Sequence, residues 1–245
     1  MKTTTEADHR TRIDLGWKVP PVSAYGRRNM AFFIAAATLL IAGCGDDSKR
    51  GNKEESSKGV AASTICDGTL DTEAAGALQR LAGTNRFEEG TGTNEAGEPR
   101  KFSLRNTVEH LHDEYRKRGA CWVYTAGDDS GEPLLEIRFS ASSSHPSASQ
   151  KESSGQTRYP LGVYANTGPT GADLFFQCTT KAPSKDAYIG DAKYVKAELL
   201  STATKIQGDS SDKDRMLILN SISRKLAQEA GCASEADLPT TVPSQ

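Results

Sequence analysis

The chain is poor in the residues on which catalytic and metal sites are most often built. Its 245 residues include only four histidines, two tryptophans and five cysteines. Three of the histidines follow residue 43, and they stand at His110, His112 and His145. Neither a His-Glu-x-x-His zinc motif nor a Gly-x-Ser-x-Gly nucleophile elbow occurs. We therefore predict no metal ligand, no cofactor and no assigned catalytic residue.

Long hydrophobic runs are also lacking. The one sustained apolar segment, 30–42, is shorter than the about 20 residues that a membrane-spanning helix needs. It follows Arg27 and Arg28 and ends in Leu39-Leu40-Ile41-Ala42-Gly43-Cys44, which is typical of a bacterial lipobox. Polar residues follow at once, which disfavours a buried core helix. The pattern predicts a signal peptide over 1–43 and a lipid-modified Cys44.

The predicted signal peptide determines where the protein is expected to work. A diacylglyceryl group on Cys44 would hold the chain to the extracytoplasmic face of the cell membrane, with the lipid bilayer as its first partner. The residues before Met30 mix basic and acidic side chains, which is unusual for such a leader, so translation is expected to start further on, at Val19 or Val22.

The chain also has no excess of positive charge. The full chain has 30 basic and 32 acidic residues, and without residues 1–43 these become 24 and 29, a net charge of −5. Nucleic-acid binding proteins need a basic patch for phosphates, so we predict no nucleic-acid partner. The dense run Arg116-Lys117-Arg118 is expected to close a helix, where cations complement the helix dipole.

Beyond Cys44 the cysteine count is even, which favours two disulfides in an oxidising compartment. Three pairings of Cys66, Cys121, Cys178 and Cys232 are possible. We prefer Cys66–Cys121 and Cys178–Cys232, because each pair would link the parts of one helix-bearing half. A zinc site is disfavoured, since no two of these cysteines have the close spacing of a zinc knuckle.

Hydrophobic spacing predicts three helices. The first begins after Asp71, a good N-cap, and ends at Gly83, with Leu70, Ala74, Leu78 and Leu81 on one face. The second is expected over 103–118 and the third over 212–230, with Gly231 as its stop. Residues 88–100 are rich in Gly, Glu and Thr and are expected to form a loop.

Alternating apolar residues predict a sheet of about five strands. Strands are expected at 121–124 and 135–139, around the turn 127–131, then at 161–165 and 172–178 around 166–171, and finally at 193–200. The Ser-rich run 140–155 is expected to be a mobile loop. The order of elements predicts an α+β class with an antiparallel sheet and helices on one face. Beyond the signal peptide, we expect a polar tether (44–62), a domain (63–235) and a disordered tail (236–245).

Three short patterns suggest chemistry, and each has a plainer interpretation. His110 can meet Asp113 or Glu114 on a helix, which is more typical of a solvated face than of a metal site. Ser210-Ser211-Asp212-Lys213 has the Ser-x-x-Lys spacing of penicillin-recognising enzymes, but the partner motifs are missing and helix capping explains it. Asp128-Asp129-Ser130-Gly131 lacks the ligand spacing of a calcium loop and is interpreted as a hairpin connection. Trp122 is expected to pack on the core beside the Cys121 disulfide.

The layout as a whole resembles actinobacterial surface lipoproteins of unknown function. The resemblance rests on the lipobox, the polar tether, the capped helix after Cys66, the Cys121-Trp122 strand, Phe175-Phe176-Gln177-Cys178 and Ala230-Gly231-Cys232. It implies a location on the cell surface and a fold held together by disulfides. From this we expect a non-catalytic binding or interaction module of the cell envelope, with an envelope protein or a small ligand as partner. The alternative is a cell-envelope hydrolase with a serine nucleophile.

Overall fold

The computed structural model describes residues 59–93, 97, 100–147, 154–207 and 211–243. The chain divides into two units, Met1–Gly51 and Asn52–Gln245, and all of the described residues belong to the second. The predicted signal peptide, Cys44 and most of the predicted tether lie outside the described residues. None of the helices in the described part is long and apolar enough to cross a membrane.

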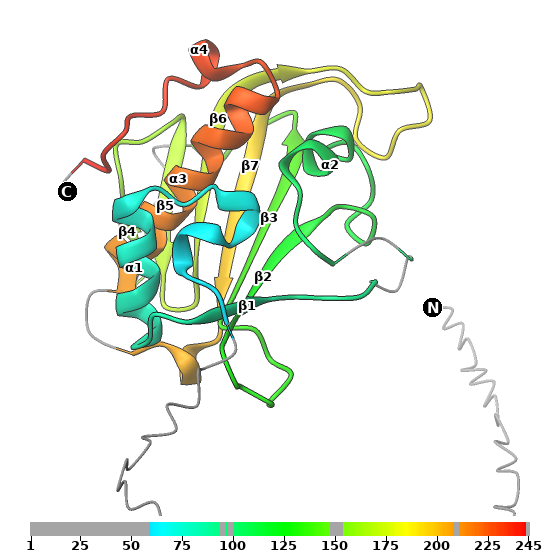
Figure 1. The fold of residues 1–245 in the computed structure, drawn as a ribbon. Helices are drawn as coiled ribbons and strands as arrows, with labels where there is room; N and C mark the ends of the chain where they lie inside the picture. Colours follow the sequence, from blue (N-terminus) through cyan, green and yellow to red (C-terminus); the bar gives the residue numbers. More distant parts are fainter. Residues whose placement is uncertain (1–58, 94–96, 98–99, 148–153, 208–210, 244–245) are drawn as a thin grey trace, which may run out of the picture. The chain divides into compact units, whose positions relative to one another are not determined.

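The fold is α+β, as predicted, but its antiparallel sheet has seven strands rather than five (Figure 1). The strand order across the sheet is β1-β2-β3-β7-β6-β5-β4. The strands are β1 (Phe87–Glu89), β2 (Ala120–Thr125), β3 (Leu135–Ser142), β4 (Thr157–Arg158), β5 (Tyr164–Gly168), β6 (Gly171–Thr180) and β7 (Ala192–Ser201). The two strands that the sequence did not predict, β1 and β4, are the short edge strands.

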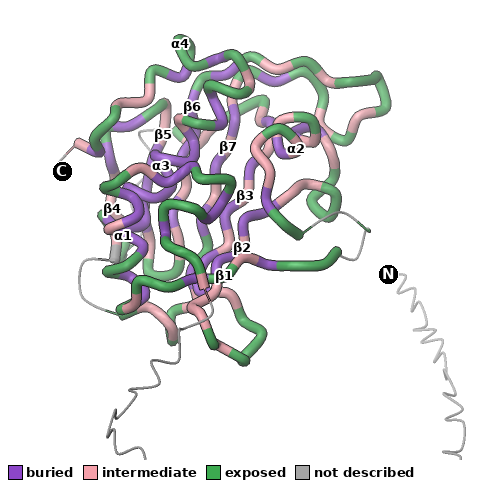
Figure 2. Tube along the Cα trace, in the orientation of Figure 1, coloured by how far each residue is buried: buried purple, intermediate pink, exposed green. Residues whose placement is uncertain are grey.

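Helices cover one face of this sheet. Figure 1 shows α1 (Thr72–Ala82) and α3 (Ser211–Glu229) stacked over it, and α3 contacts β5, β6 and β7. The remaining helices are the short α2 (Leu104–Glu109) and α4 (Ala233–Ala236) and the 3-10 turns η1 (Ala62–Thr64), η2 (Cys66–Gly68) and η3 (Ala203–Lys205). Figure 2 shows buried positions along these helices and along the strands that they cover.

The ends of α1 are the ones predicted. The Asp71 side chain accepts a hydrogen bond from the backbone N–H of Ala74, which satisfies one of the free donors at the start of the helix. Gly83 ends the helix with a left-handed φ of 64°, a conformation that glycine adopts at little cost. Leu78 and Leu81 are buried, so their side of the helix faces the core.

The predicted second helix over 103–118 is wrong in length, because α2 ends at Glu109. Beyond it the chain leaves the helical path and docks on the edge of β3, where the carbonyl of Leu111 accepts a hydrogen bond from the N–H of Ala141. His112 and Ile189 are joined in the same way, by a backbone hydrogen bond. Arg116-Lys117-Arg118 therefore does not close a helix but leads into β2.

Packing also extends past both predicted ends of the domain. Val60 pairs with Phe87 as an isolated bridge, and Ala62 is fully buried. In the segment predicted to be a disordered tail, Val242 is buried and the carbonyl of Pro239 accepts a hydrogen bond from Asn220. Part of the predicted loop 140–155 belongs to β3, which continues to Ser142.

Both preferred disulfides are formed. Cys66–Cys121 and Cys178–Cys232 have Cα–Cα distances of 5.5 and 5.3 Å, which are ordinary for disulfides. The first ties η2 to β2, and the second ties β6 to the chain after α3. The disulfide prediction is therefore confirmed, including its connectivity.

Candidate functional site: the open face of the sheet

The face of the sheet opposite α1 and α3 carries half-exposed polar and aromatic side chains. Because side chains alternate along a strand, the buried positions of β3, β6 and β7 fix which residues point to this side. We call this surface the open face, and the members used below are Trp122, Glu136, Arg138, Asn166, Asp173, Phe175, Lys196, Glu198 and Leu200. Leu200 belongs to this face and is 43% exposed.

Trp122 lies on the open face and not on the core, so the prediction for this residue is wrong. Cys121 and Val123 on either side of it are buried, which turns the indole to the other side of β2. The guanidinium of Arg138 lies 5.5 Å from the indole ring and that of Arg100 lies 5.3 Å from it. These cation–π contacts leave the ring half-exposed beside positive charge.

Arg138 connects the Trp122 end of the face to its centre. Its guanidinium forms an ion pair with Glu136 and lies 3.9 Å from the ring of Tyr115. Arg118 lies 5.6 Å from the same ring, and burial together with the positive charge of Arg138 lowers the pKa of Arg118. The residues 110–119 that fail to form a helix thus deliver Tyr115 and Arg118 to the edge of the open face.

A row of acceptor groups crosses three strands at the centre of the face. Glu198 on β7 is paired in register with Asp173 on β6, and Asp173 is paired with Asn166 on β5. Lys196 Nζ bridges the two carboxylates, 2.9 Å from Glu198 Oε1 and 3.0 Å from Asp173 Oδ1. Burial lowers the pKa of Lys196, but the hydrogen bond to Glu198 and the negative charges of Asp173 and Glu198 outweigh this effect, and the pKa is raised.

This row lines a hollow of about 220 Å³ at the end of the open face. Its walls are Asn166, Asp173, Glu198 and the β5–β6 turn around Pro169 and Thr170. A larger hollow of about 570 Å³ lies elsewhere, between α4 and the segment 160–163. There the Glu235 carboxylate already accepts hydrogen bonds from the N–H and the hydroxyl of Thr179, so the smaller hollow offers the better set of polar groups.

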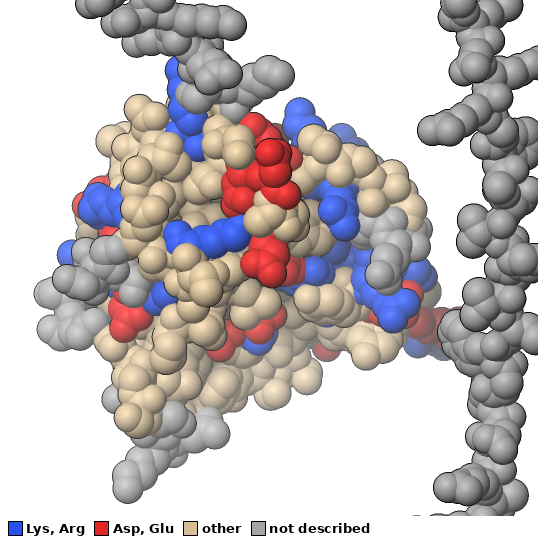
Figure 3. Space-filling model, turned by 90° about the horizontal axis from the view of Figure 1, so that it is seen from below, with Lys and Arg blue, Asp and Glu red and all other residues tan. Residues whose placement is uncertain are grey.

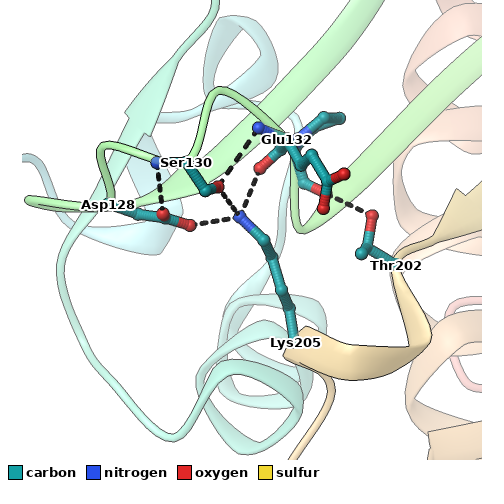
Figure 4. Close-up of polar contacts among 6 residues, drawn as sticks. Asp128, Ser130, Glu132, Thr202 and Lys205 are labelled. Carbon is teal, nitrogen blue, oxygen red and sulfur yellow. Dashed lines mark hydrogen bonds and ion pairs between the residues drawn. The ribbon is translucent and has the colours of Figure 1, made fainter.

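The predicted hairpin connection over Asp128–Gly131 is confirmed, since this segment joins β2 to β3, and it holds a lysine (Figure 4). Lys205 Nζ bonds the carboxylate of Asp128, the hydroxyl of Ser130 and, at 2.6 Å, the carbonyl of Glu132. The hydrogen bond from Lys205 is the main reason that the pKa of Asp128 falls to about 2.

Lys205 Nζ donates all three of these hydrogen bonds, including the one to the Ser130 hydroxyl, which is not the arrangement of a base that takes a proton from Ser130. The cluster instead fastens the β2–β3 loop to η3. Figure 3 looks onto this end of the molecule and shows basic and acidic side chains lying next to one another there.

The three described histidines each contact a neighbouring group in the fold. His110 Nδ1 lies 2.6 Å from Asp113 Oδ2, as the spacing predicted, although His110 caps α2 instead of lying within a longer helix. His112 is buried, and its Nδ1 lies 2.9 Å from the carbonyl of Ile189. His145 packs edge-on against Tyr194.

Glu89 forms a second polar cluster, with the first disulfide. Its Oε1 accepts a hydrogen bond from the N–H of Cys66 at 2.7 Å and lies 3.7 Å from Cys121 Sγ, and burial raises its pKa. Cys66 and Asp67 have left-handed φ angles of 50° and 60°, which are costly for residues with a Cβ. With both sulfurs in a disulfide, the three groups brace this turn.

In the Ser-x-x-Lys pattern, Ser210 lies outside the described residues, and Lys213 belongs to the first turn of α3. The expected capping role of this segment therefore stays a prediction, and the catalytic pairing of Ser210 with Lys213 stays the alternative.

Comparison of the chain with protein-family models, with curated proteins and with solved structures finds no significant match. The resemblance to actinobacterial surface lipoproteins stays a prediction.

Proposed function

We propose that this protein is an extracytoplasmic binding module, attached to the cell membrane through a diacylglyceryl group on Cys44. Its partner is an envelope protein or a small ligand, and it binds on the open face. The observation that carries the proposal is the composition of that face. The helices pack on the opposite side of the sheet, while Trp122, Arg138, Lys196 and Leu200 remain partly accessible beside a preformed hollow.

The location is supported by two independent features. The lipobox ending at Cys44 is a sequence feature, whereas the two disulfides belong to the folded domain. Disulfides persist in oxidising compartments and are rare in the cytosol. Two disulfides beyond a single leading cysteine are consistent with an exported, lipid-anchored chain.

Binding is favoured over catalysis by the environment of the polar groups. Ion pairs and hydrogen bonds hold Lys205, His110 and His112 in structural contacts, as described above. The alternative of a serine hydrolase with Ser210 and Lys213 rests on the sequence pattern alone, because Ser210 lies outside the described residues. Covalent labelling of the folded protein by a fluorophosphonate would support that alternative.

Photo-crosslinking in intact cells tests the proposal. We would place a benzoylphenylalanine at Leu200, on the open face, and, in a matched control, at Gln79, an exposed position of α1. We expect a crosslinked product from the Leu200 position and none from Gln79. Equal products from both positions, or none from Leu200, would contradict binding on the open face.

A further inference from the structure

The turn that carries Cys66 has an unusual backbone. Cys66, Asp67 and Gly68 follow one another with φ angles of 50°, 60° and 65°, so three consecutive residues are left-handed. Glycine adopts this conformation at little cost, but a residue with a Cβ is strained in it. Among the described residues, the other non-glycine residue with a positive φ is Asp237. Strain of this kind persists only where the surrounding structure enforces it, and it is concentrated at functional sites.

The Cys66–Cys121 disulfide is the covalent link that holds this turn in place, since it joins the turn to β2. Hydrogen bonds assist it. The N–H of Leu104 donates to Asp67 Oδ2 at 3.1 Å, and the hydroxyl of Thr69 donates to the carbonyl of Cys66 at 2.7 Å. Once the disulfide is reduced, only hydrogen bonds hold the turn, and its two strained residues can relax. Release of this strain therefore favours reduction.

A carboxylate beside the disulfide favours the reduced form as well. Glu89 Oε1 accepts a hydrogen bond from the N–H of Cys66 at 2.7 Å and lies 3.7 Å from Cys121 Sγ. A disulfide sulfur has no hydrogen to donate, so this oxygen gains nothing from Cys121 while the bond is intact. A Cys121 thiol can donate a hydrogen bond to it, and a charged acceptor makes such a bond stronger. Stabilisation of the reduced form makes a disulfide easier to reduce.

The Cys178–Cys232 disulfide has neither of these features. It closes a loop of nearly the same length, with a sequence separation of 54 against 55. Neither of its cysteines has a positive φ. In the part of the chain that the structure describes, the cluster of two cysteines and a carboxylate is formed by Cys66, Glu89 and Cys121 alone. Loop length gives the two bonds nearly equal stability, so the turn and the carboxylate distinguish them.

The sulfurs of the first disulfide are buried, but the turn that covers them is at the surface. Cys66 and Cys121 are 0% exposed, whereas Asp67 and Gly68 are exposed. Local opening of a weakly held segment gives reagents access to buried groups without unfolding of the whole domain. Opening of the strained turn would admit a thiol to Cys66.

Reduction of this disulfide would affect the open face through β1 and β2. Trp122 directly follows Cys121 on β2. The N–H of Gly90, the residue after Glu89, donates a hydrogen bond to the carbonyl of Trp122 at 3.0 Å. Gly90 packs so closely on Trp122 that a Cβ at Gly90 would lie 3.3 Å from the Trp122 Cβ. Movement of Glu89 and Cys121 therefore changes the surroundings of the indole.

We propose that Cys66–Cys121 is a redox-active disulfide, which a dithiol reductant opens while Cys178–Cys232 stays closed. One thiolate of the reductant attacks a sulfur of the bond and forms a mixed disulfide. The second thiol of the reductant then displaces the protein cysteine and closes the reductant's own disulfide. Two electrons and two protons thereby convert Cys66 and Cys121 into thiols. The inference goes beyond the proposed binding function and does not depend on it.

Redox titration of the full chain with reduced and oxidised dithiothreitol tests the proposal. The thiols are alkylated at each ratio, and peptide mass spectrometry measures the fraction of each disulfide that remains. We expect the equilibrium constant for reduction of Cys66–Cys121 to exceed that of Cys178–Cys232 at least about tenfold, a difference of about 30 mV. Equal constants, or reduction of Cys178–Cys232 at the lower dithiothreitol ratio, would overturn the proposal.

Two variants test the two causes. Asp67→Gly removes the strain of one left-handed residue, and Glu89→Gln removes the charged acceptor for the thiol. Each should lower the equilibrium constant for reduction of the first disulfide at least about threefold. The matched controls are Asp237→Gly, a left-handed residue outside this turn, and Glu88→Gln, an exposed carboxylate of β1, and neither should change the constant. Unchanged constants in both test variants, or equal changes in the controls, would overturn the proposal.

Nuclear magnetic resonance of the ¹⁵N-labelled full chain shows whether the change is local. The spectrum is recorded at the dithiothreitol ratio at which only the first disulfide is reduced. We expect shifts at the backbone amides of Leu104 and Trp122, and unchanged amides at Leu174 and Val195 in the middle of the sheet. Loss of the dispersed spectrum as a whole would overturn the proposal, because the disulfide would then be needed for the fold itself.

Discussion

Removal of each disulfide in turn gives the most quantitative test of how this domain is stabilised. The two bonds close loops of nearly equal length, with sequence separations of 55 for Cys66–Cys121 and 54 for Cys178–Cys232. In the chain-entropy account, closing a loop of that size in the unfolded chain stabilises the fold by about 4 kcal/mol. Loop length alone therefore predicts equal losses for the two double variants.

The left-handed turn at Cys66 makes the two expected losses of stability unequal. The first disulfide holds Cys66 and Asp67 at φ angles of 50° and 60°, each of which costs about 1 kcal/mol for a residue with a Cβ. Once the Cys66–Cys121 bond is removed, this turn can relax, and the relaxation offsets part of the lost free energy of unfolding. We expect about 3 kcal/mol of lost stability for Cys66→Ala/Cys121→Ala and about 4 kcal/mol for Cys178→Ala/Cys232→Ala.

Equilibrium unfolding in urea measures both values, with circular dichroism and intrinsic fluorescence as two probes of the same transition. Losses below about 1 kcal/mol in both variants would refute the entropic reasoning. A larger loss for the Cys66/Cys121 variant than for the Cys178/Cys232 variant would refute the claim that the left-handed turn opposes its disulfide.

Four further outcomes are expected. Arg215→Met should cost about 3 kcal/mol in urea unfolding, because buried acceptors lose their charged donor; a loss near zero would contradict the hydrogen bonding described. Asp71→Ala should cost about 1 kcal/mol in the same assay through loss of the cap, and an unchanged midpoint would exclude that role. In carboxyl-detected pH titrations the pKa of Asp128 should lie near 2 in the parent chain and rise toward its ordinary value of 3.8 in Lys205→Met, where only the hydrogen bonds from Ser130 still lower it. Since the folded-state pKa is depressed, this contact stabilises the fold above the ordinary pKa and ceases to do so as the pH falls toward 2; equal titration in both chains would refute the ion pair. Cys44→Ala should move the protein from the membrane fraction to the soluble fraction, and an unchanged distribution would refute the anchor.

Local signals in the sequence were sufficient for the elements whose cause is local. Asp71 and Gly83 define α1 because capping depends on a few neighbouring residues. Alternation along 193–200 was enough to find β7, which is buried on one side only. The two disulfides are predictable from the even number of cysteines after Cys44 and from the pairs that would each link one half of the domain.

Elements decided by distant contacts were missed. The spacing of Leu104, Val108 and Leu111 is helical, yet Leu111 bonds to the edge of β3, and this tertiary contact ends the helix. The edge strand β1 is short and acidic at Glu88 and Glu89, so nothing in its composition distinguishes it from a loop. It exists because β2 offers it an unpaired edge.

The open face was predictable only in part. Cys121 and Trp122 are neighbours on a strand, so a buried Cys121 requires Trp122 to face the other side, and this signal was available. The row of Asn166, Asp173 and Glu198 was not available, because it depends on the register of three strands. Asn166 itself was expected in a turn, whereas β5 continues through it to Gly168.

Native mass spectrometry of the protein extracted from the membranes of its own cells tests the central claim most directly. The account predicts a mature chain that begins at a diacylglyceryl-modified Cys44, retains both disulfides, and carries a bound partner or small ligand. An unmodified chain that begins before Cys44, with no bound species under any extraction condition, would contradict both the anchor and the binding function.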